Sequence, residues 1–558
     1  MLKSEANDNI QDYLQTLGPT QGTDYSLWKA TKRLKQPQIS IPPLRLSDGV
    51  WARSAQEKAE TFAQHLTEVF TPHPSQMQSE EEVIHRVLNE TYQLELPLKK
   101  FKINEVTKTI RDLSPKKAPG YDLITGQILQ NLPKKGWKFL TQLFNAVLIT
   151  SFFPLQWKVA QIILILKPGK NPENVKSYRS ISLLPILSKV FEKLLLFRLK
   201  PIIERKELIP NHQFGFRNQH ATIEQAHRVY NKILASLEEK KYCSGVFLDI
   251  TQAFDKVWHT GLLYKIKSNL SLGYYTLLKA YLQDRYFFVK YQDAATKLHK
   301  IQAGVPQGSV LGPILYLLYT ADLPTNSGVM TATFADDTAV LASHESPILA
   351  TQMLQNSLND IPKWLNTWRI KANKAKSAHV TFTTRRETCP EVSLNGQQIP
   401  QSEVAKYLGV HFDRRLTWKT HIFTKRKQLG LKLRKLFWLL NRRSRLTLEN
   451  KLLIYKTILK PVWTYGIQLW GTAANSNVEI LQRFQSKILR MIVDAPWFVT
   501  NDTIHRDLQV PSVKEETLNY CKNYRDRLKK HPNILTANLM KPRSIRRLKK
   551  KIPFDFIH

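Results

Sequence analysis

The stretch TFADDTAVL, residues 333–341, carries two adjacent aspartates, Asp336 and Asp337, between two short apolar runs. Apolar and β-branched residues on both sides are typical of strands, so the pattern predicts a hairpin with the acidic pair at its tip. Hairpin tips favour aspartate for reasons of turn geometry alone. Taken by itself, the segment therefore fits an ordinary turn and a functional site at roughly even odds.

A second acidic segment, GVFLDITQAFD at residues 245–255, places Asp249 inside another strand-like apolar run. A carboxylate in such a run is costly to bury unless it is paired or bound to a metal ion. Phosphoryl transfer to a nucleotide needs two hard cations held by carboxylates, and one strand plus a neighbouring hairpin can supply them. We therefore expect Asp249, Asp336 and Asp337 to bind catalytic metal ions.

The surrounding sequence predicts an α+β (mixed α/β) body. Short strand-like and helical runs alternate from Trp157 to about Asp413, beginning with the β-branched run WKVAQIILIL at 157–166. Upstream, helical spacing of apolar residues predicts helices at 52–70, 126–131 and 135–150. Downstream, basic amphipathic helices dominate.

The charge balance points to a polyanionic partner. The chain has 558 residues, enough for two to four domains, with 83 Lys and Arg against 45 Asp and Glu, a net charge of +38. From His411 onward we count 32 basic against 10 acidic residues. A solvated basic surface is the plain alternative, but so localised an excess favours a face that docks phosphates, with nucleic acid ahead of a membrane surface.

Cysteine use and hydropathy exclude other classes. Cys243, Cys389 and Cys521 form no CxxC pair, so neither a zinc knuckle nor a disulfide framework is expected. The N-terminus lacks the apolar core of a signal peptide. The longest apolar stretch, Val310–Tyr319, is too short to span a bilayer. We expect a protein that is not secreted and does not enter a membrane.

Three motifs in one order give a specific resemblance. FLDITQAFDKVWH (247–259), AGVPQGSVLGP (303–313) and FADD (334–337) resemble the reverse transcriptases of non-LTR (LINE-type) retrotransposons. The segments YRSISLL (178–184), QFGFR (213–217) and YLGV (407–410) are similar in sequence to those of insect Jockey-like elements. The resemblance covers about residues 100–480 and is closest over 157–413.

The resemblance implies a right-hand polymerase with fingers, a palm built from an antiparallel sheet plus helices, and a helical thumb. The expected division is a helical N-terminal extension and linker (1–100), an N-terminal extension of the fingers (101–156), fingers and palm (157–413), a basic helical thumb (414–500) and a basic C-terminal tail (501–558). The charge run at the end of the tail is expected to be mobile.

The resemblance also implies an activity, RNA-directed DNA polymerase, a nucleotidyltransferase that adds dNTPs to a primer 3′-OH on an RNA template. The implied cofactor is Mg²⁺, with Mn²⁺ as its substitute. RNA template, DNA primer or target DNA, and dNTPs are the implied partners, in a ribonucleoprotein of nucleus and cytoplasm. Two alternatives stay open: a catalytically idle nucleic-acid-binding remnant of a transposable element, and a group II intron-type maturase.

Residue roles carry over by motif. Asp249, Asp336 and Asp337 match the metal-binding aspartates, joined by the backbone carbonyl of Ile250. Phe254 matches the aromatic residue that faces the sugar 2′ position and rejects ribonucleotides, although core packing is the usual fate of Phe. Asp255 is interpreted as structural, in a salt bridge.

Nucleotide-binding roles fall on two further segments. Gln307 and Gly308 match the Pro-Gln-Gly element, where Gly lets the backbone approach nucleotide and template closely. Lys167 and Arg179 match cations that clamp the triphosphate, with Arg suited to a bidentate hold. The family usually has Pro after this Arg, and here Ser180 follows, which weakens the inferred loop geometry.

Downstream motifs complete the expected site. Asn373 and Lys376 match an Asn-x-x-Lys motif, in which Lys376 protonates the leaving pyrophosphate and Lys374 is a close rival. Tyr407, Leu408 and Gly409 match the hairpin that grips the primer terminus. No endonuclease or ribonuclease H pattern is found, so we expect a nuclease or another element-encoded protein to be supplied elsewhere.

Overall fold

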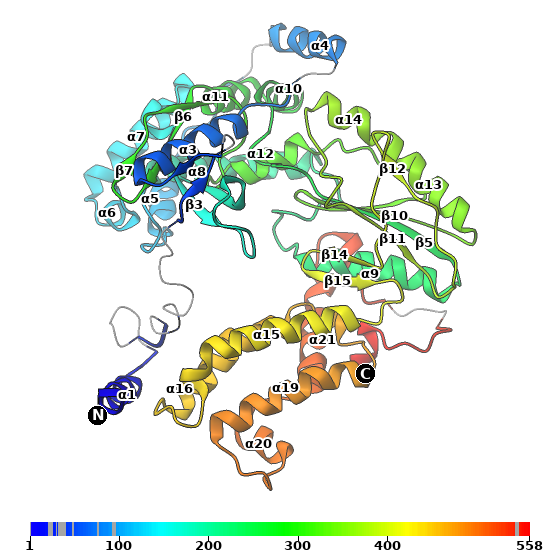
Figure 1. Cartoon of the computed structure of the whole chain (residues 1–558). Helices are drawn as coiled ribbons and strands as arrows, with labels where there is room; N and C mark the ends of the chain where they lie inside the picture. The colour runs from blue at the N-terminus through cyan, green and yellow to red at the C-terminus, as the bar shows by residue number, and fades with distance from the viewer. Residues whose placement is uncertain are drawn as a thin grey trace.

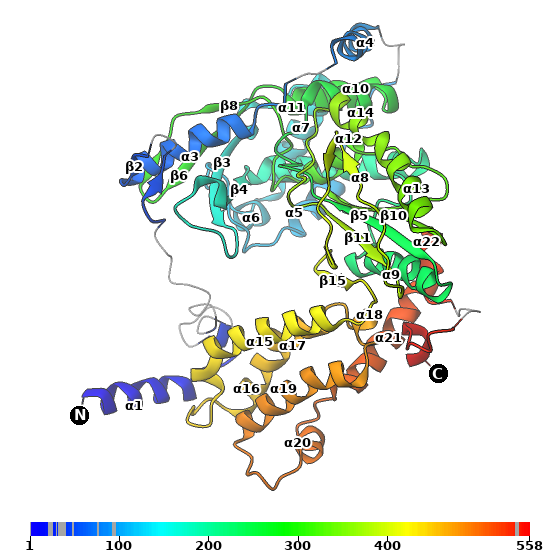
Figure 2. The same ribbon diagram turned by 45° about the vertical axis from the view of Figure 1, so that its right-hand side comes forward.

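The computed structural model describes the chain over these ranges: 2–19, 26–28, 31, 41–46, 49–74, 77–91, 96–541 and 546–557. Figures 1 and 2 show three bodies: an upper lobe formed by the N-terminal half, a neighbouring sheet-centred body, and a lower body of helices from the C-terminal half. They correspond to the fingers, palm and thumb of the expected right hand.

The palm is built on an antiparallel sheet whose strand order is β11-β5-β10-β9. Its members are β5 (Tyr242–Leu248), β9 (Met330–Phe334), β10 (Asp337–His344) and β11 (Ala378–Phe382). Every residue of β5 is buried. Alternate side chains of β5 pack with α9 (Thr222–Glu238) on one face and with α13 (Pro347–Asn359) on the other. Burial on both faces explains why β5 reads as an almost continuous apolar run.

The fingers sheet has the order β4-β3-β6-β7, with β8 (His299–Ile301) also paired to β6. Its other strands are β3 (Val159–Leu166), β4 (Tyr178–Leu183), β6 (Arg285–Tyr291) and β7 (Ala294–Ala295). Helix α3 (Ala55–Val69) packs against this sheet through buried Phe62 and Leu66. The α3 N-terminus is closed by a capping box between Ser54 and Glu57. The predicted strand and helix are thus confirmed.

Further upstream helices surround an aromatic cluster of Phe144, Phe153, Trp157 and Phe191, whose ring centroids lie 5.6–6.1 Å apart. The helices at 126–131 and 135–150 are confirmed as α6 and α7. The bounds in this region are α4 (Gln78–Asn89), α5 (Ile103–Arg111), α6 (Gly126–Gln130), α7 (Lys134–Thr150), η1 (Leu155–Trp157), η2 (Val175–Ser177), α8 (Ile186–Arg205), α10 (His259–Asn269), α11 (Leu272–Leu282), α12 (Gly312–Tyr319) and α14 (Ile361–Thr367).

The thumb is helical, as expected. Its elements are α15 (Lys419–Leu440), α16 (Leu448–Ile454), η3 (Tyr455–Leu459), α17 (Lys460–Thr464), α18 (Ile467–Trp470) and α19 (Asn475–Val493). The segment from α16 to α17 is interrupted by the π-helical turn η3. Pro461 follows this turn, and since it has no amide hydrogen it cannot continue a regular hydrogen-bond ladder.

The N-terminal extension is divided between two bodies. Helix α1 (Leu2–Gln15) lies beside α16 in both views, far from α3 (Figures 1 and 2). Asn450 Nδ2 donates to the carbonyl of Leu17 (2.8 Å), and Arg445 forms an ion pair with Asp12. The smaller strands are β1 (Leu44–Arg45), β2 (Trp51–Ala52), β12 (Ser393–Leu394), β13 (Gln397–Gln398), β14 (Val404–Tyr407) and β15 (Val410–Asp413).

The C-terminal stretch differs from the expected tail. It folds into α20 (Asn501–Asp507), α21 (Val513–Lys529), α22 (Ile534–Ala537) and η4 (Pro553–Phe556). Helix α21 buries Cys521, Tyr524 and Leu528. Part of the final charge run also contacts the palm, since Arg547 donates to the carbonyls of Leu237 and Glu238. Residues 542–545 lie outside the described residues.

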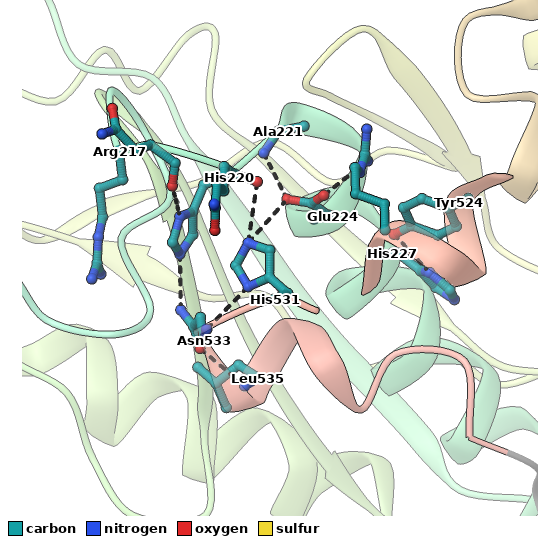
Figure 3. A network of polar contacts seen from close by, with 12 residues as sticks. Arg217, His220, Ala221, Glu224, His227, Tyr524, His531, Asn533 and Leu535 are labelled. Atoms are coloured by element: carbon teal, nitrogen blue, oxygen red, sulfur yellow. Dashed lines mark hydrogen bonds and ion pairs between the residues drawn. The ribbon is translucent and has the colours of Figure 1, made fainter. Parts of the chain in front are cut away.

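Polar contacts attach this C-terminal part to the palm beside α9 (Figure 3). The buried carboxylate of Glu224 accepts from the Ala221 amide (2.7 Å) and pairs with Arg527 (2.8 Å). His531 Nε2 lies 3.1 Å from the Gln219 carbonyl, and Asn533 Nδ2 donates to the Asn211 carbonyl (3.1 Å). The segment after α21 thereby braces the loop that precedes α9.

None of the helices in the described part of the chain is long and apolar enough to cross a membrane.

Asn533 tests this brace. Asn533→Ala removes both the bond to Asn211 and the side-chain cap on the Leu535 amide (2.9 Å). We expect a loss of about 1–2 kcal/mol in the free energy of unfolding, measured from the urea midpoint at unchanged m-value. Asn538→Ala, at an exposed position just after the same helix, is the control. Equal midpoints for the two variants would contradict the brace.

Candidate active site

The three aspartates meet at one end of the palm sheet. β9 and β10 are joined by Ala335 and Asp336, with Asp337 opposite Phe334 as the first residue of β10. Asp249 directly follows β5, which pairs with β10 in the register Thr338↔Leu248. The predicted hairpin and its neighbouring strand are therefore confirmed, because antiparallel pairing brings the end of β5 beside the start of β10.

Asp336 and Asp337 both have raised pKa values. Burial raises the pKa of Asp336, and the charge of Asp249 adds to that effect. The pKa of Asp337 is raised to about 6 by burial, then by the charges of Asp336 and Asp249. Accumulated negative charge of this kind is what a divalent cation neutralises.

The donor chemistry fits a hard divalent metal ion. Carboxylate oxygens are the ligands that Mg²⁺ accepts, and the carbonyl of Ile250 follows Asp249 directly. No three His, Cys, Asp or Glu side chains of the described residues are close enough to surround an ion by themselves. A magnesium site completed by substrate phosphate oxygens needs only one or two protein carboxylates.

A cavity of about 610 Å³ opens beside these aspartates. It contains most of the residues predicted from the sequence, namely Lys167, Arg179, Asp249, Ile250, Phe254, Gln307, Asp336, Asn373 and Lys376. Asp337, Gly308 and the 407–409 hairpin do not line it. A larger hollow of about 1070 Å³ lies between α19, α20 and α21 and contains none of the predicted residues.

Phe254 forms one wall of this cavity. Its ring stacks on Tyr316 with centroids 4.4 Å apart and meets Phe216 edge-on at 5.8 Å. Tyr316 is buried, so the ring of Phe254 is backed by a fixed partner. Offset-stacked and edge-to-face pairs hold aromatic rings in defined orientations. Phe254 is therefore both packed and exposed to the cavity.

The side chain of Gln307 is held by a hydrogen bond to Asp255. Gln307 Nε2 donates to Asp255 Oδ1 (2.9 Å), and the Gln307 carbonyl accepts from the Ser182 amide (2.9 Å). The salt bridge expected for Asp255 is thus replaced by an amide hydrogen bond. Gly308 has φ +128°, and a Cβ there would lie 2.5 Å from the Ser182 carbonyl oxygen. Gly308 thus permits a close approach to β4.

The cationic side of the cavity includes residues that the sequence motifs did not indicate. Lys167 Nζ donates to the Lys176 carbonyl (2.8 Å), and Arg179 is exposed on β4. His65 of α3 and Lys176 of η2 also line the cavity. His65 lies more than one hundred residues before Lys167, and only the amphipathic spacing of α3 indicated that it belongs to a packed helix.

The structure separates the two rival lysines. Lys376 Nζ lies 3.6 Å from Asp249 Oδ2, whereas Lys374 Nζ donates to Gln397 Oε1 (2.8 Å) on the β12–β13 hairpin. The Asn373 amide donates to the Asp249 carbonyl (2.7 Å), which fixes this loop to the end of β5. Lys376 is therefore the lysine placed at the carboxylates.

The 407–409 hairpin is a tight turn between β14 and β15, with Leu408 and Gly409 both at positive φ. Tyr407 and Leu408 are buried, and Tyr407 Oη donates to the Ala332 carbonyl of β9 (3.0 Å). The side chain of Tyr407 therefore packs against the palm sheet.

Comparison with known proteins shows which family the chain resembles. Residues 165–412 match the family model described as reverse transcriptase (RNA-dependent DNA polymerase). This family depends on divalent metal ions, which agrees with the donor chemistry of the three aspartates.

Nearly the whole chain is related to polymerases of mobile elements. It is 43% identical over 98% of its length to a probable RNA-directed DNA polymerase from transposon X-element of Drosophila melanogaster, and 41% identical over 98% to the RNA-directed DNA polymerase from mobile element jockey of the same species. It covers 61% and 62% of these relatives. The resemblance to non-LTR, Jockey-like reverse transcriptases and the right-hand fold class are confirmed.

Asp255 gives a pH-dependent prediction. Burial raises its pKa from 3.8 to about 7, although Gln307 and Lys167 favour the charged form. Because the folded-state pKa is raised, the stabilisation is fully present below the unfolded pKa and is lost as pH rises through about 7. Asparagine cannot ionise, so Asp255→Asn should gain about 2–4 °C in Tm over wild type at about pH 8 but not at about pH 4.

Scanning fluorimetry at the two pH values measures this difference. Asp293→Asn, at an exposed position in the turn between β6 and β7, serves as the control. A Tm difference for Asp255→Asn that is the same at both pH values would show that Asp255 is already ionised in the folded protein.

Proposed function

We propose that the chain is an RNA-directed DNA polymerase that adds dNTPs to a primer 3′-OH on an RNA template, as in a non-LTR retrotransposon. The observation that carries this proposal is the cavity in which Asp249 and Asp336 face Phe254, Gln307 and a set of cations. Metal-binding carboxylates, a sugar-facing wall and phosphate-binding cations are the parts that nucleotide addition requires.

In this proposal Asp249, Asp336, Asp337 and the carbonyl of Ile250 hold Mg²⁺, or Mn²⁺ in its place. The bound ions would lower the pKa of the primer 3′-OH and neutralise charge on the triphosphate. Lys376, whose Nζ lies 3.6 Å from Asp249 Oδ2, would give a proton to the departing pyrophosphate.

The triphosphate is assigned to the cationic side of the cavity. Lys167, Lys176 and Arg179 supply charge and hydrogen-bond donors from two adjacent segments of the fingers. Burial lowers the pKa of His65; the charge of Glu68 opposes this shift, and Lys176 and Lys167 add to it, so the neutral ring is favoured. A neutral imidazole offers one N–H donor there without adding to the repulsion among the lysines.

The thumb and the 407–409 hairpin are assigned to the template–primer duplex. Helix α15 exposes Lys419, Lys427, Lys432, Arg434 and Lys435, and Figure 2 shows it on the side of the thumb that faces the fingers. Exposed cations along one helix suit phosphate contacts of the kind that make binding dependent on salt. We place the protein in a ribonucleoprotein of nucleus and cytoplasm, with nuclease activity supplied by another protein or segment.

Asp336→Asn tests the metal assignment. The variant removes one carboxylate charge while keeping the side-chain volume, so template-directed primer extension should fall at least about 100-fold. The assay uses an RNA template, a DNA primer, dNTPs and Mg²⁺, with Asp293→Asn as the matched control at an exposed site. Extension by Asp336→Asn at the wild-type rate would exclude the metal role.

Phe254→Ala tests the choice of sugar. Without the ring, the wall beside the 2′ position is open, so the ratio of rNTP to dNTP incorporation should rise by about 10-fold or more. Phe216→Ala, which removes only the edge-on neighbour, should change the ratio less. Single-nucleotide extension kinetics give both values. An unchanged ratio in Phe254→Ala would show that Phe254 serves core packing and does not select the sugar.

The second candidate, a nucleic-acid-binding remnant without catalysis, is supported by the net charge of +38. It predicts tight, salt-sensitive binding of primer–template with no extension by the wild-type chain. The same extension assay, run beside a filter-binding titration, decides between the two functions.

A further inference from the structure

The segment 212–216, which overlaps the motif QFGFR (213–217), runs along β9 where that strand reaches the turn at Ala335 and Asp336, called the catalytic turn below. The Phe214 amide donates to the Thr333 carbonyl (2.9 Å), and the Thr333 amide donates to the His212 carbonyl (3.2 Å). Gln213 and Thr333 form a parallel bridge. The motif therefore adds a short strand-like segment to the edge of the palm sheet that ends at Asp336.

Gln213 then reaches past β9 to the turn itself. Its Oε1 accepts from the Ala335 amide (2.9 Å), and its Nε2 donates to the Ala335 carbonyl (3.2 Å). Oε1 also accepts from the Gly215 amide (2.8 Å). Gln213 is 5% exposed, so these bonds are protected from water. One carboxamide thus satisfies both polar backbone groups of Ala335.

Ala335 is an unusual residue to find in this backbone conformation. Its φ is +56°, in the left-handed region that a residue with a Cβ adopts only at an energetic cost. Ala335 immediately precedes Asp336 and lies two residues before Asp337. If Ala335 relaxed toward ordinary φ, the direction of the chain through both aspartates would change. The bonds from Gln213 oppose that relaxation.

Gly215 leaves room for this contact. A Cβ on Gly215 would lie 2.2 Å from the Ala335 nitrogen and 2.9 Å from its Cα. Any side chain at position 215 would therefore push the catalytic turn away from the segment. The spacing Gln-x-Gly combines the side chain that binds Ala335 with the glycine that permits the approach.

We propose that Gln213 is a positioning residue that holds Ala335 in its left-handed conformation and so fixes the Asp336 and Asp337 carboxylates for metal binding. The inference rests on the proposed function only in assigning metal to those aspartates. It requires an amide of this length, because one atom must accept and another must donate to the same residue.

A purely structural role for Gln213 makes a different prediction, and Gln225 separates the two. Gln225 is also buried, and its Nε2 donates to the carbonyls of His212 and Thr333, both at 2.7 Å. It therefore ties the same segment to the same strand without contacting Ala335. Loss of Gln225 weakens the packing of the segment, whereas loss of Gln213 also releases the turn.

The experiment compares Gln213→Met with Gln225→Met in the full chain. Methionine keeps the volume of the side chain, adds no charge and removes the amide bonds. Each variant is bound to a primer–template whose primer ends in a 3′-dideoxynucleotide, with the matching dNTP, so that no chemistry occurs. Mn²⁺ is titrated and its free concentration is read by electron paramagnetic resonance, with Tm recorded in parallel.

We expect Gln213→Met to bind Mn²⁺ about 10-fold more weakly than wild type, and Gln225→Met to stay within about 2-fold at a similar loss of Tm. Hydrogen exchange at the Ala335 amide should accelerate in Gln213→Met alone. Wild-type Mn²⁺ affinity in Gln213→Met, or equal weakening in both variants, would overturn the proposal. If Gln213→Met does not fold, Gln213→Asn, which keeps the amide but shortens its reach, is measured instead.

Primer extension separates the proposed polymerase function from the positioning role of Gln213. An inactive wild-type chain with the expected Mn²⁺ results would reject the proposed function and keep the positioning role. An active wild-type chain with normal metal affinity in both variants would keep the function and reject the positioning role. If the function and the positioning role are both upheld, Gln213→Met should require more Mg²⁺ for its half-maximal rate. Its KM for dNTP should be unchanged, because Gln213 does not contact the lysine and arginine side chains assigned to the triphosphate.

Discussion

Repulsion among three carboxylates at one end of a sheet is the constraint on which the site depends. The register of β10 with β5 and β9 leaves Asp249, Asp336 and Asp337 no way to separate without breaking strand pairs. The pKa values of Asp336 and Asp337 are raised first by burial and then by the neighbouring carboxylate charges. The fold must therefore be stable enough elsewhere to hold these carboxylates together.

The palm meets that requirement by burying its sheet on both faces. β5 is buried along its whole length, with α9 on one side and α13 on the other. The C-terminal segment then braces α9 from outside, through Glu224 and Arg527. Each layer restricts the one inside it, so elements distant from the cavity contribute to the geometry of the aspartates.

The hairpin and the first strand of the fingers could be predicted from the sequence because their determinants are local. Short apolar runs on both sides of Asp336 and Asp337 specify a hairpin, and the β-branched run before Leu166 specifies a strand. Features that depend on tertiary contacts could not be predicted in this way. Nothing near His65 indicates the cavity, and a basic overall composition concealed the apolar spacing of α21, which was expected to be a tail.

The ion pair between Lys376 and Asp249 is compatible with the metal binding proposed for Asp249. Its members are 64% and 39% exposed, so the pair is worth about 0–1 kcal/mol and is partly screened by solvent. A divalent ion, with twice the charge and direct coordination, competes easily for the same oxygen. Exchange would release the Lys376 ammonium toward the cavity that also holds Lys167 and Arg179. A weak internal cation of this kind offsets carboxylate repulsion and would not block a divalent ion.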